Sequence, residues 1–322
     1  MKKASVKNII TALLFAVCAA LLLAGCSEGG TSVDNSEAFD GQPTVSNGVY
    51  GEESVEAASD KYTDYDLDAT WDSSATVIAL LGDTAEVSGK GAEVSGSTVN
   101  IVQEGTYVFS GTLDDGQIVV SVEKVEKVHI VLNGASVTCS DSSALYIMSA
   151  DKVCITSVKD TVNSFTDGAV YNYGEGEVEH NSCVYSKDDL TLNGTGTLNV
   201  TGNYNNGRAT TNDLKIVSGT INVSAVNNSV KGKDSIAVNS GIINITSQDD
   251  GMKVENETES EKGYLCIEGG TVTVNAGDDA LQSSQSVTIS GGTVTANFVG
   301  QSVNCLGAVD IKEGCLIENE FE

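Results

Sequence analysis

Acidic side chains recur at matching positions in the second half of the chain, where short apolar segments alternate with turns. Four aspartates precede such segments and four follow them: Asp188, Asp189, Asp213 and Asp234 before, and Asp249, Asp250, Asp278 and Asp279 after. If equivalent positions lie over one another, like charges about 5 Å apart repel by roughly 1 to 3 kcal/mol per pair. A hard divalent cation removes that repulsion, so these residues are predicted to bind calcium. The alternative is that they are solvated turn residues, favoured by local turn geometry.

The apolar segments beside these aspartates repeat at a nearly constant interval. Their second residues are separated by 24, 22, 29, 22 and 22 positions along the series Leu190, Leu214, Ile236, Leu265, Val287 and Val309. Each segment is followed by a glycine turn and by a second segment in which apolar residues alternate with polar ones. Strands this short can bury their apolar faces only by stacking on copies of themselves.

The repeat predicts an all-β fold, a parallel β-helix solenoid of about 22 residues per coil. Residues 99–120 are predicted as a β region that caps its N-terminal end, and residues 168–183 as a loop extruded from one coil. A β-sandwich is the competing all-β fold, because its turns recur at similar intervals. A sandwich, however, gives no reason for residues about 22 apart to keep the same phase.

The composition limits the classes of partner. Lys and Arg number 17 against 45 Asp and Glu, which gives a formal net charge of -28. Nucleic acid and anionic membrane surfaces are therefore excluded as partners, because their phosphates would repel the chain. Cations are its natural partners, and a monomer is expected.

The first 25 residues are typical of an export signal. Lysines near the start precede an apolar run from Ile9 to Leu23, and small residues come before Cys26. The segment resembles a bacterial lipoprotein signal, which implies that Cys26 is lipidated and anchors the protein on the extracellular face of the cell membrane. Residues 26–72 are rich in acidic residues and are predicted as a disordered tether. Residues 73–322 are predicted as the binding domain.

Tyrosines and lysines near the turns are candidates for sugar binding, because a tyrosine ring can stack on a sugar while its hydroxyl meets water. Tyr185 and Tyr204, with Lys187 and Lys233, form the predicted carbohydrate site. The alternative for each tyrosine is packing within a turn or loop. The six cysteines after Cys26 are expected to be free thiols, with Cys305 and Cys315 as the one pair to test for a disulfide.

Several motifs, taken in order, resemble the bacterial lipoproteins known as carbohydrate-binding domain-containing proteins. They are Ser186–Leu190 (SKDDL), Gly202–Gly207 (GNYNNG), Val230–Ile236 (VKGKDSI) and Glu261–Tyr264 (EKGY). The resemblance implies a right-handed parallel β-helix, calcium ions in or near the eight aspartates, and binding to polygalacturonate and related plant polysaccharides, with cellulose as a further ligand. The chain departs from the family pattern at Arg208 and Asn212, at Asn228 and Ser229 in place of Asp-Gly, and at Ala280 in place of Gly.

A calcium-dependent lyase of the pectate lyase type is the enzymatic alternative. Such a lyase needs a strong base beside the bound uronate, usually arginine, and Arg208 is the one arginine of the sequence. His129 and His180 lack a partner motif. The aspartates recur from coil to coil, which favours a column of binding positions over one catalytic pair. The sequence therefore predicts a non-catalytic adhesin in which calcium bridges protein carboxylates to the uronates of an acidic polysaccharide. The third alternative is a structural stalk or a protein-binding adhesin.

Overall fold

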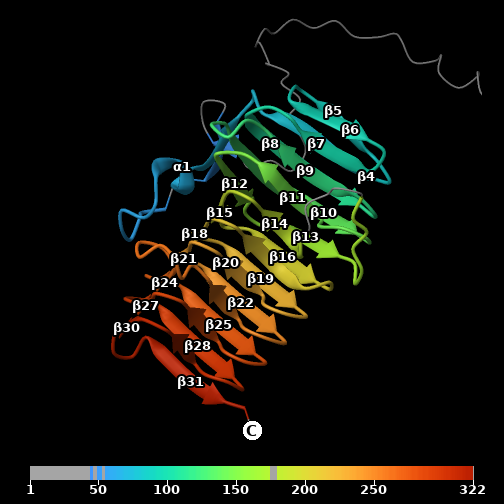
Figure 1. The fold of residues 1–322 in the computed structure, drawn as a ribbon. Coiled ribbons are helices and arrows are strands. Elements are labelled where there is room, and N and C mark those ends of the chain that lie inside the picture. Colours follow the sequence, from blue (N-terminus) through green and yellow to red (C-terminus); the bar gives the residue numbers. More distant parts are fainter. Residues whose placement is uncertain (1–43, 46–48, 53–54, 175–179, 322) are drawn as a thin grey trace, which may run out of the picture. The chain divides into compact units, whose positions relative to one another are not determined.

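The computed structural model describes residues 44–45, 49–52, 55–174 and 180–321. From residue 105 onward, short strands lie beside one another in parallel and follow one another down the body of the protein (Figure 1). The predicted signal peptide and Cys26 lie outside the described residues. The N-terminal segment supplies helix α1 (Asp64–Leu67) and a small antiparallel sheet formed by β1 (Thr44–Val45), β2 (Val49–Glu52) and β3 (Ala69–Asp72).

The larger sheet contains eighteen strands, and its hydrogen-bonded order closes on itself as a barrel. Its first strands are β4 (Thr76–Gly82), β5 (Ala85–Ser88), β8 (Gly105–Leu113) and β10 (Lys127–Cys139). One parallel ladder then runs through β12 (Lys152–Ser157), β15 (Asp189–Gly194), β18 (Asp213–Ile216), β21 (Ser235–Val238), β24 (Tyr264–Ile267), β27 (Ser286–Ile289) and β30 (Ala308–Ile311). A second runs through β13 (Val162–Asp167), β16 (Thr197–Gly202), β19 (Thr220–Ala225), β22 (Ile242–Ser247), β25 (Thr271–Ala276), β28 (Thr293–Phe298) and β31 (Leu316–Glu320).

A separate sheet of ten strands completes the body. It begins with an antiparallel pair and continues in parallel. Its members are β6 (Ala92–Ser95), β7 (Thr98–Ile101), β9 (Gln117–Ser121), β11 (Leu145–Ser149), β14 (Ser182–Ser186), β17 (Asn206–Thr210), β20 (Val230–Gly232), β23 (Met252–Val254), β26 (Leu281–Ser283) and β29 (Val303–Cys305). The apolar side chains of both sheets share one core, to which Ile118, Leu190 and Leu198 belong.

Alternation along each strand separates a buried face from an outer face. In β16, Leu198 and Val200 are buried, whereas Asn199 is half-buried. Leu198 lies in register with Ile221 of β19, which confirms the predicted stacking of residues about 22 apart. On the outer face, the amide of Asn222 donates a hydrogen bond of 2.8 Å to Asn199, so polar side chains at equivalent positions also form a ladder.

The strand order corrects the predicted fold class. We expected a right-handed parallel β-helix with an N-terminal capping region, whereas eighteen strands form one sheet that closes as a barrel beside a ten-stranded sheet. The reason lies in β10, whose 13 residues pair with β12 through one half and with β13 through the other. The two ladders are thereby joined into one sheet. Residues 99–120 are not a cap, because β8 and β9 pair in parallel with β10 and β11.

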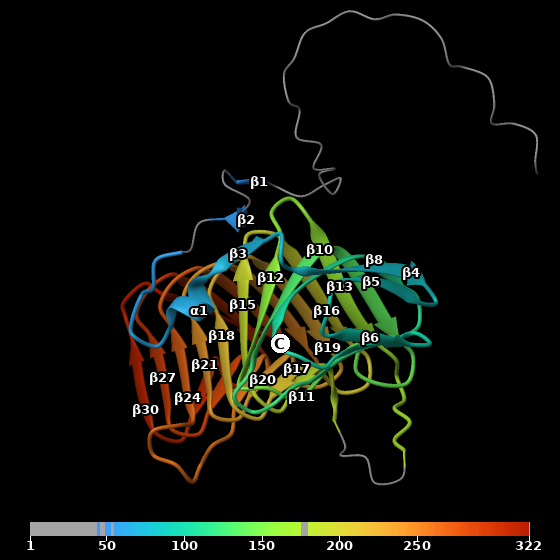
Figure 2. The ribbon, with the colours of Figure 1, turned by 90° about the horizontal axis from the view of Figure 1, so that it is seen from above.

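Residues 55–72 pack against the outer face of the larger sheet. Tyr62 contacts Val217 and Ala237, and Trp71 covers Val108. Helix α1 lies against β15 (Figure 2). A disordered tether was expected over residues 26–72. Residues 55–72 differ from this expectation, because Asp66, Tyr62 and Trp71 are buried. Apolar contacts make this possible despite the high charge of the segment. All six cysteines of the described residues are free thiols, Cys305 and Cys315 included.

Candidate functional site

A row of outward-facing residues crosses the ten-stranded sheet at right angles to its strands. Each member lies in register with the next, one strand further on, so neighbours are about 4.8 Å apart. The row, which we call the tyrosine–lysine row, consists of Tyr146, Tyr185, Ala209, Lys231, Lys253, Gln282 and Asn304. Parallel stacking therefore converts residues scattered along the sequence into a linear array of aromatic, cationic and amide groups.

Six aromatic rings gather at the first end of this row. They belong to Tyr146, Tyr171, Tyr173, His180, Tyr185 and Tyr204. The rings of Tyr171 and Tyr204 stack with centroids 4.2 Å apart, and His180 lies 4.3 Å from Tyr146. The rings of Tyr173, Tyr185 and Tyr204 are half-buried, so part of each remains accessible. This aromatic cluster offers flat apolar surfaces of the kind on which sugar rings stack.

Two lysines occupy the middle of the row. Lys231 and Lys253 are half-buried, and each forms an ion pair with Glu255, at 2.6 and 3.6 Å. Lys253, Gln282 and Asn304 line a groove of about 460 Å³, which Glu255 and Glu257 also line. Ammonium and amide groups in such a groove can donate hydrogen bonds to carboxylates and hydroxyls.

Three carboxylates come together on the turns that precede β23 and β26. One ligand oxygen from each of Asp249, Asp250 and Asp278 lies within 4.8 Å of the others. We call these residues the carboxylate cluster. Asp250 is buried, Asp249 is half-buried and Asp278 is exposed, so the cluster opens to solvent on one side. Lys253 of the tyrosine–lysine row donates to Oδ2 of Asp250 at 2.8 Å, which places the cluster beside the row.

The surroundings of the carboxylate cluster fit a calcium ion. Asn228 precedes Asp250 by one strand layer, since Val230 lies in register with Met252. Its Nδ2 donates to Asn206 of the layer before at 3.2 Å, whereas its buried Oδ1 has no hydrogen-bond partner. A side chain at Gly300 would clash with the carboxylates of Asp278 and Asp279, so the glycine keeps space for them. All these donors are oxygens, the ligands that calcium takes.

The carboxylate cluster contains three carboxylates, and Lys253 is paired with one of them, Asp250. Burial, together with the nearby Asp249, raises the pKa of Asp250 above its ordinary value, although Lys253 acts in the opposite direction. The ion pair with Lys253 thus offsets the negative charge only in part. A bound divalent cation would stabilise the ionised form.

Asp279, the fourth aspartate predicted after an apolar segment, has other partners. Its Oδ1 accepts a hydrogen bond from the backbone of Gln301 at 2.8 Å, and its Oδ2 accepts from Asn304 at 2.6 Å. It therefore helps to position the turn and the end of the tyrosine–lysine row.

The four aspartates predicted before apolar segments do not join a three-carboxylate group in the described part of the chain. Asp188 forms an ion pair with Lys124, and Asp234 forms one with Lys262 at 3.0 Å. At these two positions each carboxylate is paired with a lysine ammonium, and calcium binding there stays a prediction. Asp189 and Asp213 lie in adjacent strands, and burial followed by the charge of Asp213 raises the pKa of Asp189.

The four predicted sugar-binding residues lie at two places. Tyr185, Tyr204 and Lys187 meet at the aromatic cluster, where the Lys187 ammonium lies 5.4 Å from the ring centroid of Tyr146. Lys233 is exposed on the turn after β20. Sequence reasoning did not place five members of the row in the site: Tyr146, Lys231, Lys253, Gln282 and Asn304. Comparing the strands VKG and MKV in phase would have placed Lys231 beside Lys253.

Arg208 and His129 lie away from this surface, whereas His180 is part of the aromatic cluster. Arg208 is 1% exposed in the core, where a substrate cannot reach it. His129 is buried on the larger sheet, and burial lowers its pKa to about 4 despite the charge of Asp68. A cleft of about 600 Å³ beside His129 and Trp71 is larger than the groove described above, but it shares no residue with the tyrosine–lysine row. Within the described residues, no helix combines the length and the apolar character needed to cross a membrane.

Known proteins resemble this chain over most of its strands. Residues 95–315 match the family described as carbohydrate-binding domain-containing protein. A curated relative of that description from Acetivibrio thermocellus is 44% identical over 136 residues, which are 42% of this chain and 48% of the relative. The match thus spans about half the length of that relative. A solved structure of the polysaccharide lyase-like protein from C. thermocellum, a gadolinium derivative, is 41% identical, with a TM-score of 0.74 over 76% of this chain and 99% of the solved chain.

Proposed function

The chain belongs to the family of carbohydrate-binding domain-containing proteins, and on that premise we propose that it binds an acidic polysaccharide along the tyrosine–lysine row with the help of calcium. The single observation that carries this proposal is the position of the carboxylate cluster, one hydrogen bond away from Lys253 of the row. A polysaccharide of uronates, polygalacturonate or pectin-like, matches an array of cations and aromatic rings. Cellulose would use the aromatic cluster alone.

Different side chains of the site would have different roles in binding. The carboxylates of Asp249, Asp250 and Asp278, with Oδ1 of Asn228, would hold calcium. When bound, calcium supplies the positive charge that joins protein carboxylates to uronate carboxylates. Lys231 and Lys253 would pair with further uronates, and Tyr185 and Tyr204 would stack on sugar rings.

The proposal extends to the place and character of the protein. Lipidation at Cys26 would anchor it to the extracellular face of the membrane as a monomeric surface adhesin without catalytic activity. A lyase is the second candidate, favoured by the description of the solved relative as polysaccharide lyase-like. Incubation with insoluble polygalacturonate, with and without calcium, separates the two candidates. Retention of the protein on the polysaccharide without product supports the adhesin, whereas release of unsaturated uronides supports the lyase. If neither retention nor release occurs, the protein is a structural stalk or a protein-binding adhesin.

Calcium should stabilise the fold through the carboxylate cluster. At a concentration one hundred times its dissociation constant, it should raise the melting temperature by roughly 5 to 10 °C, and chelation should reverse the rise. Differential scanning calorimetry of the wild type and Asp250→Asn checks this. The variant should show a much smaller rise, with exposed Asp310→Asn as the matched control. Equal shifts in Asp250→Asn and the wild type would place the ion elsewhere.

The two lysines of the row should contribute to affinity for the polyanion. Changing both Lys231 and Lys253 to methionine should weaken binding to polygalacturonate about tenfold, which corresponds to about 0.7 kcal/mol from each of these two half-buried charges. Binding to cellulose should change little, because cellulose carries no carboxylates. Depletion from solution by each insoluble polysaccharide measures both affinities. Changing both Lys90 and Lys159, which are exposed on other parts of the surface, to methionine controls for the change in net charge. An equal loss in this control would point to overall charge as the cause.

A further inference from the structure

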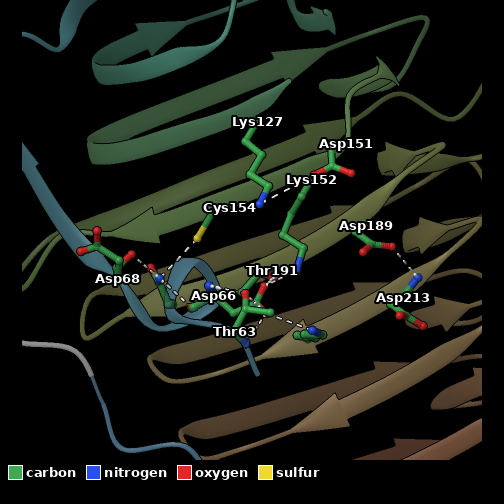
Figure 3. A network of polar contacts seen from close by, with 12 residues as sticks. Thr63, Asp66, Asp68, Lys127, Asp151, Lys152, Cys154, Asp189, Thr191 and Asp213 are labelled. Carbon is green, nitrogen blue, oxygen red and sulfur yellow. Dashed lines mark hydrogen bonds and ion pairs between the residues drawn. The ribbon is translucent and has the colours of Figure 1, made fainter. Parts of the chain in front are cut away.

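The carboxylate of Asp66 is held by three side chains from three neighbouring strands of the larger sheet, and also by the hydroxyl and the backbone N–H of Thr63, the residue that caps its own helix (Figure 3). Lys152 of β12 donates to Oδ1 at 2.8 Å, Lys215 of β18 donates to Oδ2 at 2.9 Å, and the hydroxyl of Thr191 of β15 donates to Oδ1 at 2.6 Å. Asn193 adds a hydrogen bond of 3.1 Å to the backbone oxygen of Asp66. We call Lys152, Thr191 and Lys215 the socket.

The socket and its occupant come from different parts of the chain. The socket residues all lie within residues 95–315, the region shared with the family. Asp66 lies outside that region, on the short helix α1 that packs over the sheet. The shared part of the protein therefore presents two ammoniums and a hydroxyl toward one point on its outer face. These are the groups that recognise a carboxylate.

The two lysines of the socket are shielded from solvent and pair with the Asp66 carboxylate. Lys152 and Lys215 are nearly buried, and Asp189 lies in register with Lys152. Burial opposes the ionised form of Asp66, but hydrogen bonds from Lys152 and Thr191 outweigh it, so the pKa of Asp66 lies below its ordinary value. Two cationic side chains this well buried would be left uncompensated if the carboxylate departed without a replacement.

We propose that the socket is a second carboxylate-binding site, that its external ligand is a uronate of an acidic polysaccharide, and that Asp66 fills it as an internal competitor. The choice of uronate rests on the proposed function. An incoming uronate replaces one carboxylate by another, so the lysines stay paired while residues 55–72 lift from the sheet. High local concentrations of uronate along one polysaccharide chain favour the exchange.

The thiol of Cys154 reports whether the segment lifts. It points to the outer face of β12, in register with Thr191, yet it is 1% exposed because α1 and Asn193 cover it. Cys183 is equally buried but lies in the core of the other sheet. Labelling of Cys154 therefore detects displacement of the segment, whereas labelling of Cys183 detects unfolding.

The experiment uses the wild-type chain and a small thiol reagent in the presence of a calcium chelator, which silences the carboxylate cluster. Polygalacturonate should accelerate labelling of Cys154 about fivefold or more and leave Cys183 protected, as read by peptide mass spectrometry. Uncharged dextran should have no effect. Unchanged protection of Cys154 at saturating polygalacturonate, with and without calcium, would overturn the proposal. Failure of the calcium-dependent retention, by contrast, would overturn the proposed function.

Variants provide an independent arm. Asp66→Asn removes the competing charge and should create retention on polygalacturonate in chelator, and adding Lys215→Met should abolish that gain. Asp64→Asn, an exposed neighbour on the same helix, should behave like the wild type. A folded Asp66→Asn protein without the gain would contradict the proposal.

Discussion

Replacing Asp66 by alanine should lower the free energy of unfolding by about 3 to 5 kcal/mol, because the change leaves two buried ammoniums without a partner. Lys152 and Lys215 are almost inaccessible, and both pair with this one carboxylate. Urea unfolding followed by circular dichroism measures the effect. Asp64→Ala, on the same helix but exposed, should change the free energy by less than about 0.5 kcal/mol.

The pH dependence of the Asp66 variant follows from the same contacts. Because the pKa of Asp66 is lowered in the folded protein, its stabilising contribution is complete above its ordinary pKa of about 3.9 and is lost as the pH falls below that value. The difference between the wild type and Asp66→Ala should therefore shrink on acidification below about pH 4. A difference under about 1 kcal/mol at neutral pH would show that α1 is held by apolar contacts instead.

Replacing Arg208 by methionine should raise the free energy of unfolding by about 1 to 4 kcal/mol, because a buried charge without partners is replaced by an apolar side chain. Arg208 lies in the core in register with Val184 and Val230. None of its three guanidinium nitrogens has a hydrogen-bond partner, and burial lowers its pKa to about 9. Methionine fits this environment because of its flexible apolar chain.

Denaturant unfolding of Arg208→Met and of the surface control Lys233→Met checks this expectation. The core variant should gain stability and the surface variant should not. A loss of stability in Arg208→Met would show that the guanidinium has partners in solution, such as internal water.

The stacking of repeats could be predicted from the sequence because it depends on local alternation. Leu214 and Ile236 lie in register as the spacing of 22 indicates. Asp249 and Asp278 are 29 residues apart and also meet on adjacent layers, because Met252 and Leu281 lie in register across the same longer interval. The closure of the larger sheet could not be predicted, because it depends on the length of β10 and its two partners, β12 and β13. The spacing of the repeats does not show how long the strand β10 is.

The sequence also could not predict the ion pairs between residues far apart in the chain. Lys124 lies 64 residues before Asp188, and Lys152 lies 86 residues after Asp66, so neither pair belongs to the repeat. The acidic composition of residues 26–72 suggested a solvated tether, whereas two lysines on the sheet retain part of it. Asn228 differs from the family pattern as an amide at a carboxylate position, and its buried Oδ1 has no hydrogen-bond partner.

Calcium titration with and without a soluble trimer of galacturonate tests the central claim most directly, because linkage requires each ligand to raise affinity for the other by the same factor. Isothermal titration should show calcium binding at least about fivefold tighter with the trimer present, and Asp250→Asn should lose this coupling. Equal calcium affinity in the two conditions would contradict the account, because it would mean that the ion does not join the carboxylate cluster to the sugar.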